Sequence, residues 1–227
     1  MIKNLTLCLF LALSFSAYSQ IENNTELGAG VGVLNYTGDL NNQYKFRTQR
    51  PAATVFFKYN INDATLFRAS VTGGRLFGTD EFSDNPISQV RAQSFKIFLF
   101  EASTVFEYNF INMKTNNPHI FGSPYLFGGI GIAGFSGAAQ KDGTYSPIQP
   151  VVPLGAGVKV SVTPHIYIGL EFGARITFFD YIDGVSYGDP RFKNFEFGNW
   201  YDNDTYYFLN LSASYTFYKI ACPKNPY

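Results

Sequence analysis

Eight segments of this chain alternate between apolar residues and polar or small residues with a period of two. The clearest covers residues 166–178. Its apolar face includes Leu170 and Phe172, and Glu171 lies on the other face. The other seven segments cover residues 26–36, 52–59, 65–73, 93–108, 125–132, 152–162 and 207–217. Because successive side chains of a β-strand point to opposite faces, this pattern predicts eight strands. The segment 125–132 is so rich in glycine that its two faces stay unassigned.

The connections between these segments alternate in length. Residues 60–63 and 163–164 are tight turns, and residues 109–124 form an intermediate connection. The long connections are rich in Gly, Asp, Asn and Pro and cover residues 38–50, 76–92, 133–150 and 180–204. Outer-membrane barrels have long loops outside the cell and shorter turns in the periplasm. An even number of strands places both termini in the periplasm.

The distribution of charge favours a membrane barrel over a soluble one. A soluble β-sandwich or lipocalin-like barrel would bury its apolar faces and carry many charges outside. Here only 15% of residues are charged, the net charge is zero, and the polar faces are rich in Gly and Ser. Aromatic residues near the segment ends are expected to form interfacial girdles. They are Tyr36, Tyr59, Tyr108, Phe178, Tyr207 and Phe217. We therefore predict an all-β protein, an eight-stranded antiparallel transmembrane β-barrel of the outer-membrane type, over residues 20–218.

The first 19 residues have the three parts of a secretory signal peptide. Lys3 supplies the basic start, residues 5–13 form a short apolar core, and Ala17-Tyr-Ser19 forms the cleavage site. The apolar core is shorter than the roughly 20 residues that a spanning helix needs. Cleavage before Gln20 leaves Cys222 as the single cysteine, in a C-terminal tail of residues 219–227 that we expect in the periplasm.

Five charged residues on the polar faces are expected to point into the barrel lumen. They are Arg68, Glu101, Lys159, Glu171 and Arg175. The interior of an eight-stranded barrel is just wide enough for side chains to fill it. These charges are expected to neutralise one another as a structural plug, since a proton path or solute channel would need a wider barrel. Glu171 and Arg175 lie about 13 Å apart along their strand. We therefore expect them to reach neighbouring strands, with Glu101 and Arg68 as candidate partners.

The chain has none of the motifs that small barrel enzymes or cofactor proteins use. It contains no HExxH, no CxxC, no Walker loop and no clustered metal ligands. His119 and His165 fall in predicted periplasmic turns, whereas hydrolytic chemistry would need a histidine with Ser or Asp near the outer rim. Nucleic-acid binding would call for a basic patch, which the neutral composition does not suggest. We expect no enzyme activity, cofactor, metal, nucleic acid or small-molecule substrate.

Several segments together form a recognisable pattern. They are Asn35-Tyr-Thr-Gly-Asp-Leu40 and residues 91–95, 100–110, 123–132, 153–159 and 170–186. The most specific part is Glu171-x-Gly-x-Arg175 followed by Asp180-Tyr-x-Asp183. These segments resemble the PorG-like outer-membrane barrels of the type IX secretion system. The likeness covers nearly the whole mature chain.

This resemblance implies a non-enzymatic part of a machine. Such barrels are similar in role to anchors that tie a periplasmic ring, made of a lipoprotein and its partner, to the outer membrane. The system exports proteins to the cell surface and supports gliding in some bacteria. The alternative is a stand-alone small outer-membrane barrel of the adhesin or membrane-stabilising type.

The single cysteine left after cleavage bears on the choice between an anchor and a stand-alone barrel. A single cysteine in an oxidising periplasm is either paired with another protein or a free thiol. The tail around Cys222 is short, polar and flanked by proline, and the resemblance supplies a ring lipoprotein as the partner. We therefore expect Cys222 to form an intermolecular disulfide.

Overall fold

A computed structural model describes the barrel strands and the residues next to them. It covers residues 25–37, 46–62, 64–79, 94–111, 122–136, 148–178 and 205–217. The expected signal peptide, residues 1–19, and the expected tail with Cys222 lie outside the described residues. Among the residues described, no helix is both long and apolar enough to cross a membrane.

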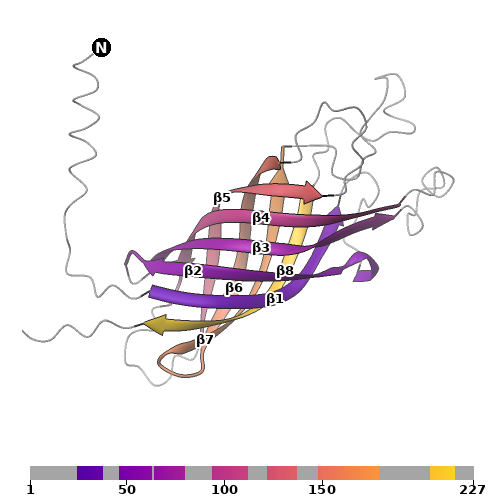
Figure 1. The fold of residues 1–227 in the computed structure, drawn as a ribbon. Coiled ribbons are helices and arrows are strands. Elements are labelled where there is room, and N and C mark those ends of the chain that lie inside the picture. Colours follow the sequence, from indigo (N-terminus) through magenta and orange to yellow (C-terminus); the bar gives the residue numbers. More distant parts are fainter. Residues whose placement is uncertain are drawn as a thin grey trace, which may run out of the picture.

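Eight strands form one closed antiparallel barrel, as the alternation predicts (Figure 1). The strands are β1 Thr25–Thr37, β2 Arg50–Asn60, β3 Thr65–Thr79, β4 Ser94–Asn109, β5 Gly122–Ser136, β6 Ile148–Ser161, β7 Ile166–Thr177 and β8 Thr205–Phe217. A short 3-10 helix, η1 Phe46–Thr48, precedes β2. Each strand pairs with its neighbours in sequence, and β8 pairs with β1 to close the sheet.

The two ends of the barrel differ in how the strands are connected. β1 begins where β8 ends, because Thr25 pairs with Phe217. The connections β2–β3, β4–β5 and β6–β7 lie at this end, which we call the turn end (Figure 1). The other four connections leave from the opposite end, which we call the loop end. The predicted alternation of lengths holds only in part. The β2–β3 and β6–β7 connections are tight turns of 4 residues, whereas β4–β5, with 12 residues, is as long as β1–β2 and longer than β5–β6, which has 11.

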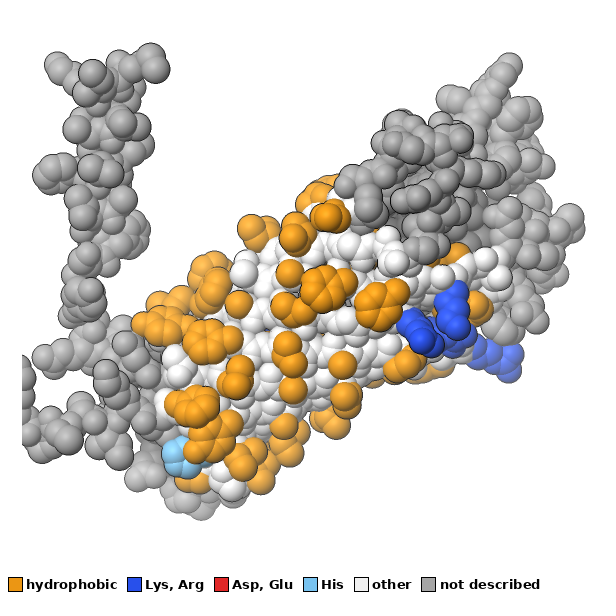
Figure 2. Space-filling model, viewed as in Figure 1, with side chains coloured by type: hydrophobic (Ala, Val, Ile, Leu, Met, Phe, Trp, Pro, Cys, Tyr) orange, Lys and Arg blue, Asp and Glu red, His pale blue; other side chains and the backbone are white. Residues whose placement is uncertain are grey.

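The outer wall of the barrel is apolar. Large hydrophobic side chains on every strand point away from the lumen, and Figure 2 shows them spread over the visible wall. Leu170 on β7 is 54% exposed, whereas its chain neighbour Glu171 is 3% exposed. Of the expected girdle residues, Tyr59, Tyr108, Phe178 and Phe217 are exposed and Tyr207 is half-buried. A wall of this kind is matched to hydrocarbon rather than to water.

Tyr36 was expected in the girdle, and this prediction is wrong. Its side chain is fully buried and packs edge-on against Phe95, with ring centroids 4.9 Å apart. It belongs to an apolar cluster that fills the loop half of the lumen. This loop-end plug consists of Leu34, Tyr36, Ala52, Leu76, Ile97, Leu99, Ala133, Phe135, Val151, Tyr206 and Phe208. Near a strand end, an aromatic residue can face either way, and here the strand register turns it inward.

The plug also explains why the strands are longer than predicted at the loop end. Residues 76–79 were assigned to a loop but continue β3, and residues 133–136 and 148–150 likewise extend β5 and β6. At several positions in this half of the barrel, apolar side chains lie on both faces. Leu76 points inward beside outward Phe77, and Ile97 points inward beside outward Phe98. The period-two signal therefore disappears where the strands continue.

The lipid-facing wall yields a direct test. Replacing Leu170 by Arg should reduce the free energy of unfolding in a bilayer by roughly 2–4 kcal/mol, the cost of a basic residue near the midplane of a barrel wall. The matched control Leu170→Phe keeps the surface apolar and should unfold like the native protein. The measurement is urea unfolding of the lipid-embedded barrel, followed by the gel shift between folded and boiled protein. Equal stability of both variants would contradict a lipid-facing β7.

Candidate functional site

Six charged side chains of alternating sign form a continuous chain of ion pairs inside the barrel. Following the contacts, they are Lys58, Glu107, Arg68, Glu171, Arg175 and Glu101. They come from β2, β3, β4 and β7, so the chain of pairs crosses the lumen rather than following one strand. We call this set the lumen charge chain.

The turn-end part of the lumen charge chain is centred on Glu107. Its carboxylate is fully buried and accepts a hydrogen bond from Lys58 Nζ at 3.0 Å. Arg68 Nη1 lies 2.9 Å from the other carboxylate oxygen. Two cations therefore share one buried carboxylate. In a low-dielectric interior such a charge is tolerated only when it is paired in this way.

Arg68 links β3 to the far wall of the barrel. Its guanidinium also donates a hydrogen bond to Glu171 on β7. The Tyr125 hydroxyl donates to the same carboxylate oxygen at 3.1 Å. The Arg68 guanidinium lies 4.9 Å from the centre of the Phe127 ring, which covers one face of the cation. Aromatic side chains from β5 thus fill the space around the charges.

Arg175 links Glu171 to Glu101, the member of the lumen charge chain that contacts the loop-end plug. Its Nη2 atom lies 3.9 Å from Glu171, and its Nε atom lies 3.6 Å from Glu101. Glu101 accepts hydrogen bonds from the Tyr206 hydroxyl at 2.7 Å and from Ser103 at 2.9 Å. Tyr206 belongs to the plug, so its hydroxyl joins the apolar half of the lumen to the charged half.

A separate ion pair lies near the turn end. Lys159 Nζ on β6 donates to both oxygens of Glu26 on β1, at 3.0 and 3.2 Å. Ser214 on β8 also donates to Glu26, at 3.3 Å. Within the described chain, all four glutamates and four of the basic residues lie in the lumen and are nearly fully buried. Their charges cancel.

The predicted lumen residues divide between these two groups. Arg68, Glu101, Glu171 and Arg175 come together in the lumen charge chain, whereas Lys159 lies in the separate pair. Arg68 contacts Glu171, and Arg175 contacts Glu101, the two partners considered from the sequence. The expectation of neighbouring strands is wrong, because β3 and β4 lie across the lumen from β7 rather than beside it. The direct contact between Glu171 and Arg175 was not expected. Two long side chains can close a 13 Å backbone separation by leaning toward each other.

The charge network predicted from the sequence left out three members of the lumen set, namely Glu26, Lys58 and Glu107. The signal that could have found them is the same alternation, since each lies on the polar face of its segment. Alternation assigns a side chain to the lumen but does not say which charges meet, because that depends on the stagger of the strands. Lys58 and Glu107, for example, are separated by the whole of β3.

One small cavity lies between these groups. A cavity of about 10 Å³ remains among Arg68, Glu171, Arg175 and Asn210. This is about the space that one water molecule needs. A substrate-sized site would need several hundred cubic ångströms.

The described histidine is not part of the lumen. His165 lies in the β6–β7 turn, where Nδ1 is 3.2 Å from the Thr216 carbonyl oxygen and the ring stacks on Tyr215. His119 lies outside the described residues. Over the described residues, no group of three or more His, Cys, Asp or Glu is placed to hold a metal ion.

A closed eight-stranded sheet with an apolar wall and a filled lumen defines a small outer-membrane β-barrel. The chain belongs to the family described as Domain of unknown function (DUF6089), which matches residues 2–224. Comparison with curated proteins found no match.

Solved structures share the fold at low sequence identity. Neisserial surface protein A (NspA) is 13% identical, with a TM-score of 0.54 over 85% of this chain and 97% of that chain. The outer membrane protein OprG of Pseudomonas aeruginosa is 10% identical, with a TM-score of 0.47 over 87% and 97%. Ail, the attachment invasion locus protein of Yersinia pestis, is 14% identical, with a TM-score of 0.47 over 87% and 100%. At these identities the likeness concerns the fold alone.

The separate ion pair offers a clean measurement of what lumen charges contribute. Lys159→Met leaves Glu26 buried without its cation and should cost about 3–5 kcal/mol of unfolding free energy. The double variant Glu26→Gln/Lys159→Met should be more stable than the sum of the two single losses, because no unpaired charge remains. A double-mutant cycle by urea unfolding measures this coupling. Arg47→Met, at an exposed arginine in η1, serves as the control and should change stability by less than about 0.5 kcal/mol. If the losses of the two single variants were strictly additive, Glu26 and Lys159 would not be coupled, and the ion pair would not contribute to stability.

Proposed function

We propose that this protein is a sealed, non-catalytic outer-membrane barrel that acts through its surfaces, as a stand-alone barrel of the adhesin or membrane-stabilising type. The observation that carries this proposal is the filling of the lumen. The loop half holds the apolar plug, and the turn half holds charges that neutralise one another.

Neither half of the lumen offers a route for solutes. A conducting pore needs a continuous polar path, and the plug interrupts it with side chains such as Leu76, Leu99 and Phe208 that are almost wholly buried. The lumen carboxylates are held by cations and hydroxyls, so none is open to a substrate. The surfaces left for function are the outer wall, the loops and the turns.

The proposed orientation places the long connections outside the cell. In outer-membrane barrels the longer loops face outward and the shorter turns face the periplasm. The ends of β1 and β8 share the turn end, so both termini would lie in the periplasm. The expected signal peptide, which directs export, agrees with this arrangement.

The second candidate function is an anchor in the type IX secretion system. The observation that favours it is the resemblance to PorG-like barrels, including Glu171-x-Gly-x-Arg175. Both charged residues of this motif point into the lumen, so this part of the likeness concerns the barrel interior. Contact with a periplasmic ring lipoprotein and its partner would instead involve the turn end and the tail, with Cys222 as a possible covalent link.

Gentle detergent extraction separates the two functions. We expect a stand-alone barrel to leave the membrane without a stoichiometric partner and to run as a monomer on a non-reducing gel. An anchor should retain the ring lipoprotein. It should also give a higher-mass band that disappears with reductant and with Cys222→Ser. A retained ring in native membranes would overturn the stand-alone proposal in favour of the anchor. The Cys222→Ser protein is the matched control, since its barrel is unchanged.

A further inference from the structure

The charges outside the lumen are all basic in the described part of the chain. They are Arg47 on η1, Arg50 at the start of β2, Arg75 on β3 and Lys96 on β4. Figure 2 shows basic side chains gathered at the loop end and no acidic side chain on the visible wall. The described glutamates are all in the lumen. Among the described residues, one sector of the loop end therefore carries only positive charge.

The strand register brings these cations together. Arg75 pairs with Phe98, and Lys96 pairs with Phe77, so the two cations are diagonal neighbours on the outer face. Diagonal neighbours in an antiparallel pair lie about 7–8 Å apart. The Arg50 guanidinium lies over the Phe77 ring, 4.2 Å from its centre. We call Arg50, Arg75 and Lys96 the basic rim.

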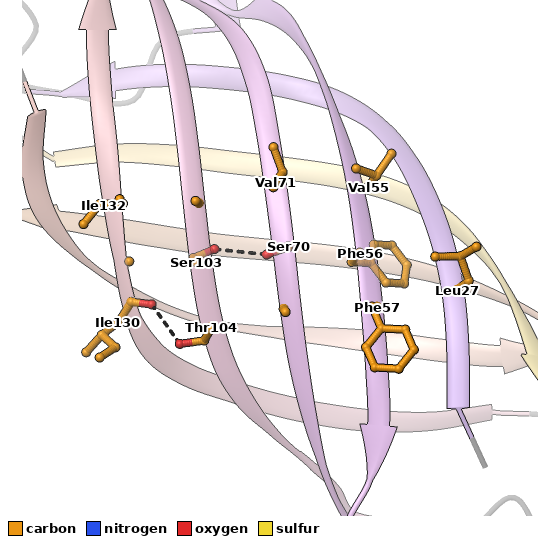
Figure 3. Close-up of a pocket in the computed structure, with 13 residues that line it drawn as sticks. Leu27, Val55, Phe56, Phe57, Ser70, Val71, Ser103, Thr104, Ile130 and Ile132 are labelled. Carbon is orange, nitrogen blue, oxygen red and sulfur yellow. Dashed lines mark hydrogen bonds between the residues drawn. The ribbon is translucent and has the colours of Figure 1, made fainter. Parts of the chain in front are cut away.

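An apolar hollow lies below the basic rim on the same wall. It has a volume of about 620 Å³ and extends over β1 to β5 (Figure 3). Ala69 and Ala102 form a low floor on the two middle strands, with Val55 and Phe57 rising on one side and Ile130 on the other. We call this hollow the trough.

Together, the basic rim and the trough span about the depth of one membrane leaflet, since the trough is lined by Val71 and Ala69. Along β3 the outward positions run from Arg75 through Gly73 and Val71 to Ala69. Six residues of strand span about 20 Å, which is roughly 14 Å of depth at a tilt of about 45°. Half of the hydrocarbon core of a bilayer is about 15 Å. Gly73 carries no side chain on this path, and the exposed rings of Phe98 and Phe100 flank it on β4.

We propose that the basic rim and the trough bind a lipid of the outer leaflet that carries phosphate on its headgroup and several acyl chains. Arg75 and Lys96 supply donors for phosphate oxygens, the anion for which Arg and Lys are best suited. The trough crosses five strands, which are about 4.8 Å apart, so it is wide enough for more than one acyl chain. A soluble anion would use only the basic rim, whereas an amphiphile with an anionic head uses both features.

This inference does not rest on the stand-alone function or on the secretion anchor. The binding site needs only the barrel and its outer wall, whereas its place in the outer leaflet rests on the proposed orientation with the loop end outside the cell. A binding assay on purified protein does not depend on which way the barrel faces in the cell. The lipid site would fail in this assay, whereas the proposed function would fail in the detergent extraction, so the two failures can be told apart.

The test is titration of barrels in nanodiscs with diphosphorylated lipid A, with bound lipid counted by native mass spectrometry. Arg75→Gln/Lys96→Gln should weaken binding about 30-fold, from about tenfold per 1.4 kcal/mol and about 1 kcal/mol for each basic residue. The matched control Arg75→Lys/Lys96→Arg keeps both charges and should bind within about twofold of the native protein. Fully dephosphorylated lipid A should bind native protein as weakly as the neutralised variant binds the phosphorylated lipid.

A second pair of variants tests the trough. Ala102→Phe fills the low floor and should weaken binding, whereas Ala213→Phe makes the same change on the outward face of β8 and should not. Heat-modifiable migration on gels shows that each variant is folded. Equal binding of phosphorylated and dephosphorylated lipid to native protein would overturn the proposal without any variant. Equal binding of phosphatidylglycerol, or full competition by inorganic phosphate, would overturn it as well.

Discussion

Closure of the sheet between β1 and β8 is the constraint on which the rest of this structure depends. In hydrocarbon, each unpaired backbone N–H or C=O group costs several kcal/mol, so a spanning sheet must have no free edge. The register from Thr25 with Phe217 to Thr37 with Thr205 pairs these two strands along their whole length. Once eight strands close, the diameter is set, and the lumen can hold only side chains.

The narrow lumen then dictates the chemistry of the inward residues. Charged side chains in such a space need partners on other strands, and the contacts from Lys58 through Glu107 and Arg68 to Glu171 provide them. The loop half of the lumen is filled by apolar side chains instead. Tyr206 connects the two halves, since its ring packs in the plug and its hydroxyl donates to Glu101. The result is an interior that is neutral and filled by side chains.

A filled lumen moves function to the outside of the barrel. The wall is not uniform, because the basic rim and the trough share one sector made by β2, β3 and β4. The remaining outer wall is apolar over the described residues. Such a barrel can make different contacts with lipid on different sides of its wall. Its lumen charges stabilise the barrel that carries this wall.

The sequence predicts the barrel well because alternation survives wherever one face is polar. Leu170 and Glu171 are assigned correctly for this reason. Prediction fails in the loop half, where Leu76 and Ile97 point inward beside outward aromatic residues and both faces become apolar. Pairing across the lumen, such as Lys159 with Glu26, depends on strand stagger, which no single strand encodes. The basic rim escapes notice because Arg75 and Lys96 are 21 positions apart in sequence and meet only through the register.

The most direct test of the account is the reactivity of a single lumen cysteine. In a Cys222→Ser background, Thr72→Cys places a thiol inside the barrel between β3 and β2, where the buried Thr72 donates a hydrogen bond to Thr54 at 3.0 Å. A charged, water-soluble thiol reagent should leave this cysteine unmodified in the folded barrel and modify it after unfolding. Asn62→Cys in the exposed β2–β3 turn should react at once. Rapid modification of Thr72→Cys in the folded barrel would contradict a sealed lumen.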